Sequence, residues 1–149
     1  MYEQNKAYQI QYECWLNVGK ASLKCQRIMN ALLSDLGITI AQHELLHRLL
    51  KTERITQKQL AESLVVVKSN IANHVKRLEK RGYIKTVSCV DDRRSKYLTL
   101  TREGKTLVDR SLVVQERLVS KMLENAKSTD IEATNRVMAN VMQSLDELS

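Results

Sequence analysis

The fold is decided by residues 60–104, which read LAESLVVVKSNIANHVKRLEKRGYIKTVSCVDDRRSKYLTLTREG. In the first half of this stretch the apolar residues Ile71, Val75 and Leu78 are spaced four and three apart. This spacing places them on one side of a helix and leaves the other side polar. The sequence therefore predicts an amphipathic helix over Lys68–Arg81.

The second half of the stretch has the pattern of a β-hairpin. Gly82 can close the helix in a left-handed conformation. Apolar and polar residues then alternate over Tyr83–Val90 and again over Lys96–Thr101, with a charged turn between them. Alternation with period two, interrupted by a short polar turn, is typical of two paired strands.

A shorter helix is expected just before the amphipathic one. Thr56 and Gln59 have the spacing of a capping box, in which each side chain bonds to the other residue's backbone. They predict a helix from Gln57 to about Leu64, joined to the next by a tight apolar connection. Two short helices, a tight turn and a hairpin make a winged helix-turn-helix.

Long helices flank this lobe on both sides. A helical period covers residues 4–36 and returns at residue 102 after the hairpin. We expect four flanking helices, over 4–36, from a Thr39–Gln42 capping box to about Lys51, over 102–126, and from a Thr129–Glu132 capping box to the end of the chain. The last carries apolar residues seven apart, so it must pack on something.

The net positive charge of the chain is concentrated in this lobe. Residues 56–102 hold eleven basic and four acidic residues, which accounts for the whole net charge of +7. A neutral body around a basic middle predicts a polyanionic partner.

Composition sets the class of protein. The 149 residues include no Pro and only four Gly, which favours long helices over a loop-rich sandwich or barrel. No secretory signal opens the chain, and no apolar run approaches the ~20 residues that a membrane span needs. We expect one mainly α domain with a small β-hairpin wing, cytoplasmic, with no membrane partner and no cofactor.

The exposed face of the predicted helix suits double-stranded DNA. An α-helix fits the major groove, where Asn pairs well with adenine and Lys with guanine or phosphate. Arginines at the hairpin tip can enter a narrow minor groove. The predicted DNA-binding residues are Lys68, Ser69, Asn70, Asn73, His74, Lys76, Arg77, Arg93, Arg94 and Lys96.

The same stretch resembles the MarR family of bacterial transcriptional regulators. The most specific parts are RLEKRGYI at 77–84, the tip Asp92-x-Arg94, and the strand-to-helix junction LTLTxxG at 98–104. The resemblance implies that Arg94 is a minor-groove arginine and that Asp92 positions the wing by pairing with an arginine. Helices flanking the lobe extend the resemblance over nearly the whole chain.

A role and an assembly also follow from this resemblance. It implies a homodimer in which residues 1–36 and 102–149 form the dimer body and residues 38–101 form the DNA-binding lobe. Two such lobes would bind a pseudo-palindromic operator, and we expect a repressor relieved by a ligand or an oxidant. A small-molecule effector would enter the crevice beside the lobe, for which the candidate residues are Trp15, His43, Leu46, His47, Leu107 and Ser111.

Three alternatives stay open. His43-Glu44-Leu45-Leu46-His47 has the H-E-x-x-H pattern of a zinc peptidase or a metal-sensing regulator, although no third ligand stands at the expected spacing. Cys14 is a candidate redox sensor, since one branch of the family carries a reactive cysteine on its first helix, whereas Cys89 is interpreted as structural. The lobe could also bind a partner other than DNA, in which case affinity would lack the steep salt dependence of phosphate contacts.

Overall fold

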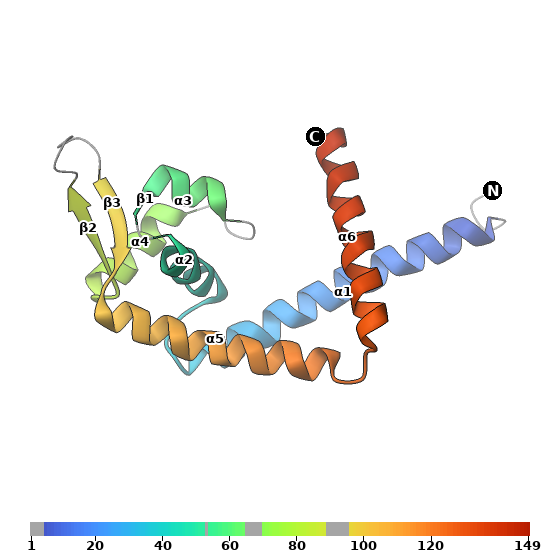
Figure 1. Ribbon diagram of the computed structural model, residues 1–149, viewed down its shortest axis with the longest axis horizontal. Coiled ribbons are helices and arrows are strands. Elements are labelled where there is room, and N and C mark those ends of the chain that lie inside the picture. Colours follow the sequence, from blue (N-terminus) through green and yellow to red (C-terminus); the bar gives the residue numbers. More distant parts are fainter. Residues whose placement is uncertain (1–4, 53, 65–69, 89–95) are drawn as a thin grey trace. The chain divides into compact units, whose positions relative to one another are not determined.

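The computed structural model describes residues 5–52, 54–64, 70–88 and 96–149, which form two compact units (Figure 1). The first unit comprises residues 1–115 and the second residues 116–149. The described elements are α1 (Lys6–Ser34), α2 (Ile40–Lys51), β1 (Ile55–Thr56), α3 (Gln57–Ser63), α4 (Ile71–Lys80), β2 (Ile84–Ser88), β3 (Lys96–Leu100), α5 (Arg102–Leu123) and α6 (Ser128–Leu148).

Two of the three predicted capping boxes are present. Thr39 Oγ1 accepts a hydrogen bond from Gln42 N, and Gln42 Oε1 accepts one from Thr39 N, which opens α2. Thr56 and Gln59 open α3 in the same way. Each box satisfies two backbone N–H groups that the first turn of a helix leaves without a partner.

The third predicted box, at Thr129 and Glu132, is wrong. α6 begins at Ser128 with Lys127 in the N-cap position, two residues earlier than a Thr129 cap would place it. The carbonyl of Lys127 accepts from Ile131 N at 3.1 Å, so Thr129 already lies inside the first turn. An N-cap side chain must stand outside the helix to reach back to its N–H groups.

α4 begins later than predicted. Asn70 has a φ of 66°, a left-handed conformation that interrupts an α-helix, so the helix starts at Ile71 and not at Lys68. Its end agrees with the prediction, since Gly82 has a φ of 77°. There Gly82 N donates to Glu79 O and Tyr83 N to Leu78 O, the paired bonds of a Schellman motif.

The wing belongs to a three-stranded antiparallel sheet of order β1–β3–β2. β2 pairs with β3 from Ile84 opposite Leu100 to Ser88 opposite Lys96, as the alternation predicts. The two-residue strand β1 was not predicted, because a period cannot be recognised in so short a segment. It adds Ile55 to the buried residues of the sheet opposite Leu98.

The hydrophobic core of the first unit lies where the lobe elements meet. Leu33 of α1, Leu46 of α2, Leu60 of α3 and Leu78 of α4 are completely shielded from solvent. In contrast, α6 has no buried residue, and α1 has only Met29 and Leu33. No helix within the described residues is long and apolar enough to cross a membrane.

Candidate nucleic-acid interface

The polar face of α4 is exposed, as its amphipathic pattern predicts. Ile71, Val75 and Leu78 are buried against the lobe. The opposite side carries the predicted contact residues: Asn70, Asn73, Lys76 and Arg77 are exposed and His74 is half-buried. The side-chain amide of Asn73 donates to Asn70 Oδ1, which orders the first turn of the helix. This face has the donors and acceptors that read base edges in a major groove.

The wing contributes one further predicted residue that the structure places. Lys96 is exposed at the first position of β3, opposite Ser88. The remaining predicted residues, Lys68, Ser69, Asp92, Arg93 and Arg94, lie outside the described residues, as does Cys89.

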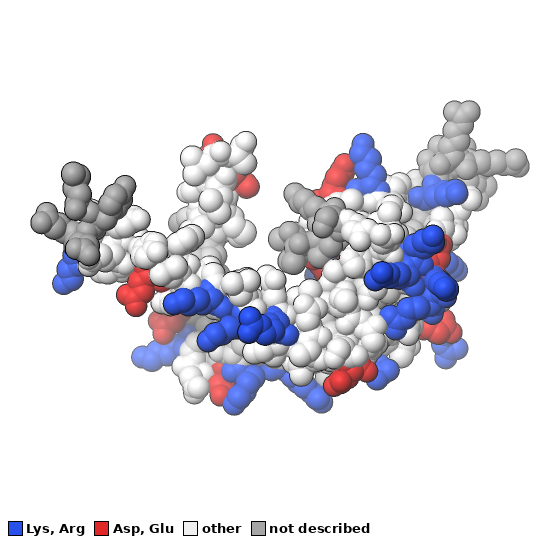
Figure 2. All heavy atoms as spheres, turned by 180° about the vertical axis from the view of Figure 1, so that it is seen from behind, with Lys and Arg blue, Asp and Glu red and all other residues white. Residues whose placement is uncertain are grey.

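More cations surround this face than the sequence reasoning selected. Lys80, Arg81 and Lys85 are also exposed. Figure 2 shows Lys and Arg side chains gathered over the lobe, with few acidic side chains between them. Within the described part of the chain, the ion pair found is Lys121–Glu124 at the end of α5, far along the sequence from this patch. The positive charge of the lobe is therefore not neutralised by neighbouring carboxylates among those residues.

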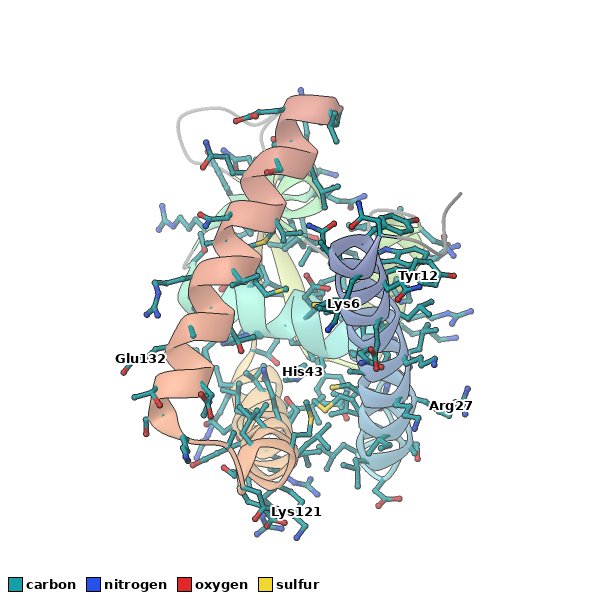
Figure 3. The ribbon with its side chains drawn as sticks, turned by 90° about the vertical axis from the view of Figure 1, so that its right-hand side faces the viewer. Lys6, Tyr12, Arg27, His43, Lys121 and Glu132 are labelled. Carbon is teal, nitrogen blue, oxygen red and sulfur yellow. The ribbon has the colours of Figure 1, made fainter. Side chains whose placement is uncertain are left out.

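His43 connects two helices in the first unit (Figure 3). Its Nδ1 lies 2.9 Å from Ser111 Oγ and its Nε2 lies 2.9 Å from Gln115 Oε1. The Ser111 hydroxyl also donates to the carbonyl of Val108 at 2.8 Å. Both ring nitrogens of His43 are thus engaged, with donor and acceptor roles that depend on the tautomer. Sequence reasoning missed Gln115, which stands 72 positions away and has no pattern that pairs it with His43.

Burial is the main influence on this imidazole. It lowers the pKa of His43 below the usual value, while the hydrogen bond to Gln115 and the charge of Glu44 act in the opposite direction. The pKa of His47 is also lowered, first by burial and then by the charges of Lys51, His43 and Arg48. The two rings stack with centroids 6.1 Å apart. Both imidazoles are therefore held toward the neutral form.

The structure brings only part of the predicted effector site together. His43 and Ser111 are hydrogen-bonded, and Leu46, Leu107 and Ser111 are buried. Trp15 is 67% exposed and its ring lies 5.6 Å from that of Tyr12. The effector site stays a prediction.

In this fold His43, the first histidine of the H-E-x-x-H pattern, is engaged in hydrogen bonds. Both ring nitrogens of His43 are engaged by Ser111 and Gln115, whereas a zinc ion would need one of them. Among the described residues, no group of three His, Cys, Asp or Glu side chains could hold a metal ion. Cys14 is exposed on α1, and its proposed redox role stays a prediction.

The MarR family model matches residues 38–96, from the start of α2 to the start of β3. The matched span contains α2, β1, α3, α4 and β2. This segment of the chain is a MarR-family winged-helix region.

Relatives and solved structures of this family agree with that assignment. An uncharacterized HTH-type transcriptional regulator of Bacillus cereus is 28% identical over 74% of each chain. A MarR-like transcription regulator from Bacillus cereus ATCC 10987 has the same fold, with a TM-score of 0.80, 17% identity, and coverage of 92% of this chain and 99% of that one. A mutant MarR from E. coli, solved in complex with operator DNA, matches with a TM-score of 0.76 and 22% identity. The match covers 93% of this chain and 99% of that one.

Proposed function

We propose that this MarR-family chain represses transcription by binding a pseudo-palindromic DNA operator as a homodimer, and that a small molecule or an oxidant relieves the repression. The proposal rests mainly on three features that fall on the same segment of the chain. The segment that matches the family model is also the segment that holds the net positive charge and the exposed polar face of α4.

The lobe supports DNA binding by its shape and its charge. A helix with a polar outer face is narrow enough for the major groove of B-DNA. Asn73 and Lys76 lie on that face, and Lys96 on the wing adds charge for the phosphates. The E. coli relative with a similar fold was solved with operator DNA, which is consistent with this use of the lobe.

The apolar surfaces of the terminal helices support the homodimer. On α1, Ile10 and Leu23 are more than 60% exposed, and on α6 Met142 and Leu145 are 60% and 58% exposed. Helices of this length with unburied apolar side chains are stabilised by packing on another surface. A second copy would supply that surface and place two lobes on the two halves of a palindrome.

Selection of bound fragments from the source genome tests the proposal. The full chain is expected to enrich fragments that share an inverted repeat and lie upstream of genes. Lys76→Ala should weaken binding to an enriched fragment, whereas Lys20→Ala on α1 removes the same charge outside the lobe and should not. Enrichment without a shared repeat would contradict operator recognition.

Repression is a separate test on the same fragments. A reporter placed behind an enriched fragment should be expressed more strongly when the chain is absent. Lower expression in its absence would make the chain an activator.

A further inference from the structure

A pocket of about 400 Å³ lies at the base of the lobe. It opens between the turn that joins α1 to α2 and the last turn of α4. Its size is within the range of small-molecule sites. Three of its lining residues are cationic and none is acidic, the six being Gly37, Thr39, Gln42, Arg77, Lys80 and Arg81.

Arg81 is held in place at one side of this pocket. Its Nη1 donates to the carbonyl of Gly37 at 2.6 Å, and its guanidinium lies over the ring of Tyr83 at 4.9 Å. Gly37 leaves room for this arrangement, since a Cβ there would lie 3.0 Å from Arg81 Nη2. A guanidinium fixed by a hydrogen bond and an aromatic ring loses little further freedom when it binds a ligand, and it has other donors left to offer.

Gln42 supplies a second donor group to the same pocket. The side chain is only 5% exposed. Its Oε1 accepts from Thr39 N at 3.1 Å, and because an N–H can only donate, this bond fixes which end of the amide carries the NH₂ group. That NH₂ group donates no hydrogen bond within the described part of the chain. Gln42 lines the pocket, so this amide is available to an acceptor group of a ligand.

The positive charge of the pocket indicates which kind of ligand would accept a hydrogen bond from the Gln42 NH₂ group. Arg77 and Lys80 are exposed and stand one turn apart on α4. No carboxylate among the described residues pairs with them or with Arg81. Three cations beside an amide donor, with no carboxylate among the lining residues, are complementary to an oxyanion.

We propose that this pocket binds the carboxylate or phosphate head group of a small anionic ligand. The ligand would join the turn before α2 to the end of α4, and it would engage Arg77, which is also on the predicted DNA-binding face. This goes beyond the proposed function, because none of the pocket residues belongs to the predicted effector crevice. The site lies near the open end of the hairpin, where Ile84 pairs with Leu100, at the other end from Ser88 and Lys96.

Titration of the ¹⁵N-labelled full chain with inorganic phosphate tests the site. The side-chain NH₂ signals of Gln42 and the Nε–H signal of Arg81 are expected to move together and to saturate. Lys80→Ala should weaken this binding about tenfold, the effect of losing one charged hydrogen bond. The matched control is Lys85→Ala, which removes the same charge from an exposed position of β2 outside the pocket.

A second variant separates shape from charge. Arg81→Lys keeps the charge but loses the planar fork of donors, so it should weaken phosphate binding while Lys85→Ala leaves it unchanged. Gln42 signals that do not move, that move without saturating, or that respond equally in Lys80→Ala and Lys85→Ala would overturn the proposal.

Duplex DNA offers the same phosphate chemistry from another source, and a parallel titration distinguishes the two. Gln42 signals that respond to phosphate and not to a duplex assign the pocket to a free anion. Signals that respond to both, with phosphate displacing the duplex, assign it to the DNA backbone. The phosphate titration contains no DNA, so its result stands even where the proposed operator binding fails.

Discussion

The carbonyl oxygen of Tyr83 occupies the space that a side chain at Gly104 would need. A Cβ on Gly104 would lie 1.9 Å from that oxygen, well inside contact distance. The same oxygen accepts from Thr101 N at 3.1 Å, and Thr101 Oγ1 donates to Gly82 O at 2.6 Å. The end of α4 and the start of α5 are therefore fixed to each other by backbone contacts, which explains the glycine in the strand-to-helix junction.

Gly104→Ala should destabilise the chain strongly. The clash is with backbone that the two hydrogen bonds from Thr101 constrain, so relief requires α5 to move away from the wing. We expect a loss of about 3 kcal/mol, at the upper end of the usual cost of overpacking. Chemical denaturation measures it. Gly19→Ala on α1 is the control, because a Cβ there meets nothing within 4 Å and should stabilise the helix by about 1 kcal/mol. Equal stability of the two variants would refute the close approach.

Acid should destabilise the fold through His43. Burial lowers the pKa of His43 in the folded state, so below its ordinary value of 6.5 the unfolded chain binds more protons than the folded one. Stability is thus greatest above pH 6.5 and falls as the pH decreases through the folded pKa. Melting curves across this range should show a smaller loss for His43→Gln, which keeps a polar side chain without the titration. Identical curves would exclude His43 as the source.

Charge on the apolar stripe of α6, which Ile131, Met138 and Leu145 form at a spacing of seven residues, should separate the protomers. Leu145 is 58% exposed and lies on the stripe, whereas Asn140 is exposed on the opposite side of the helix. Sedimentation should show that Leu145→Glu lowers the dimer fraction, because a charged carboxylate resists burial in an interface. Asn140→Glu introduces the same charge and should leave the dimer intact. A monomeric wild-type chain would contradict the proposed assembly.

Arg94→Ala should weaken operator binding by roughly 1–3 kcal/mol. The prediction depends on the family resemblance, in which this residue is a minor-groove arginine. Affinity for a selected fragment measures it, with Arg110→Ala on α5 as a control of equal charge. If the fragment binds equally well to both variants, the role assigned to the wing is wrong.

Local signals predicted most of the element boundaries. The Thr39–Gln42 and Thr56–Gln59 boxes depend on contacts three residues apart, and Gly37 and Gly82 provide left-handed caps with φ values of 69° and 77°. The spacing of Thr129 and Glu132 satisfies the same rule, but the predicted capping box is wrong. Spacing alone does not say whether a residue stands outside the helix.

Longer-range features had no comparable signal. Asn70 adopts a left-handed conformation that its sequence neighbourhood does not reveal, and β1 exists only because β3 lies beside it. The contact of His43 with Gln115 and the pocket between Gly37 and Arg81 join residues far apart in the chain. Only the folded lobe brings them together.

The proposed function requires above all that the lobe binds duplex DNA through its phosphates as part of a dimer. Its sharpest test is the affinity and stoichiometry of the full chain on a selected genomic fragment, measured as the salt concentration is raised. We predict two protomers per inverted repeat and a linear fall of log affinity with log salt, with a slope of about −0.9 for each phosphate neutralised. Binding by a single protomer, or an affinity that salt leaves unchanged, would contradict it.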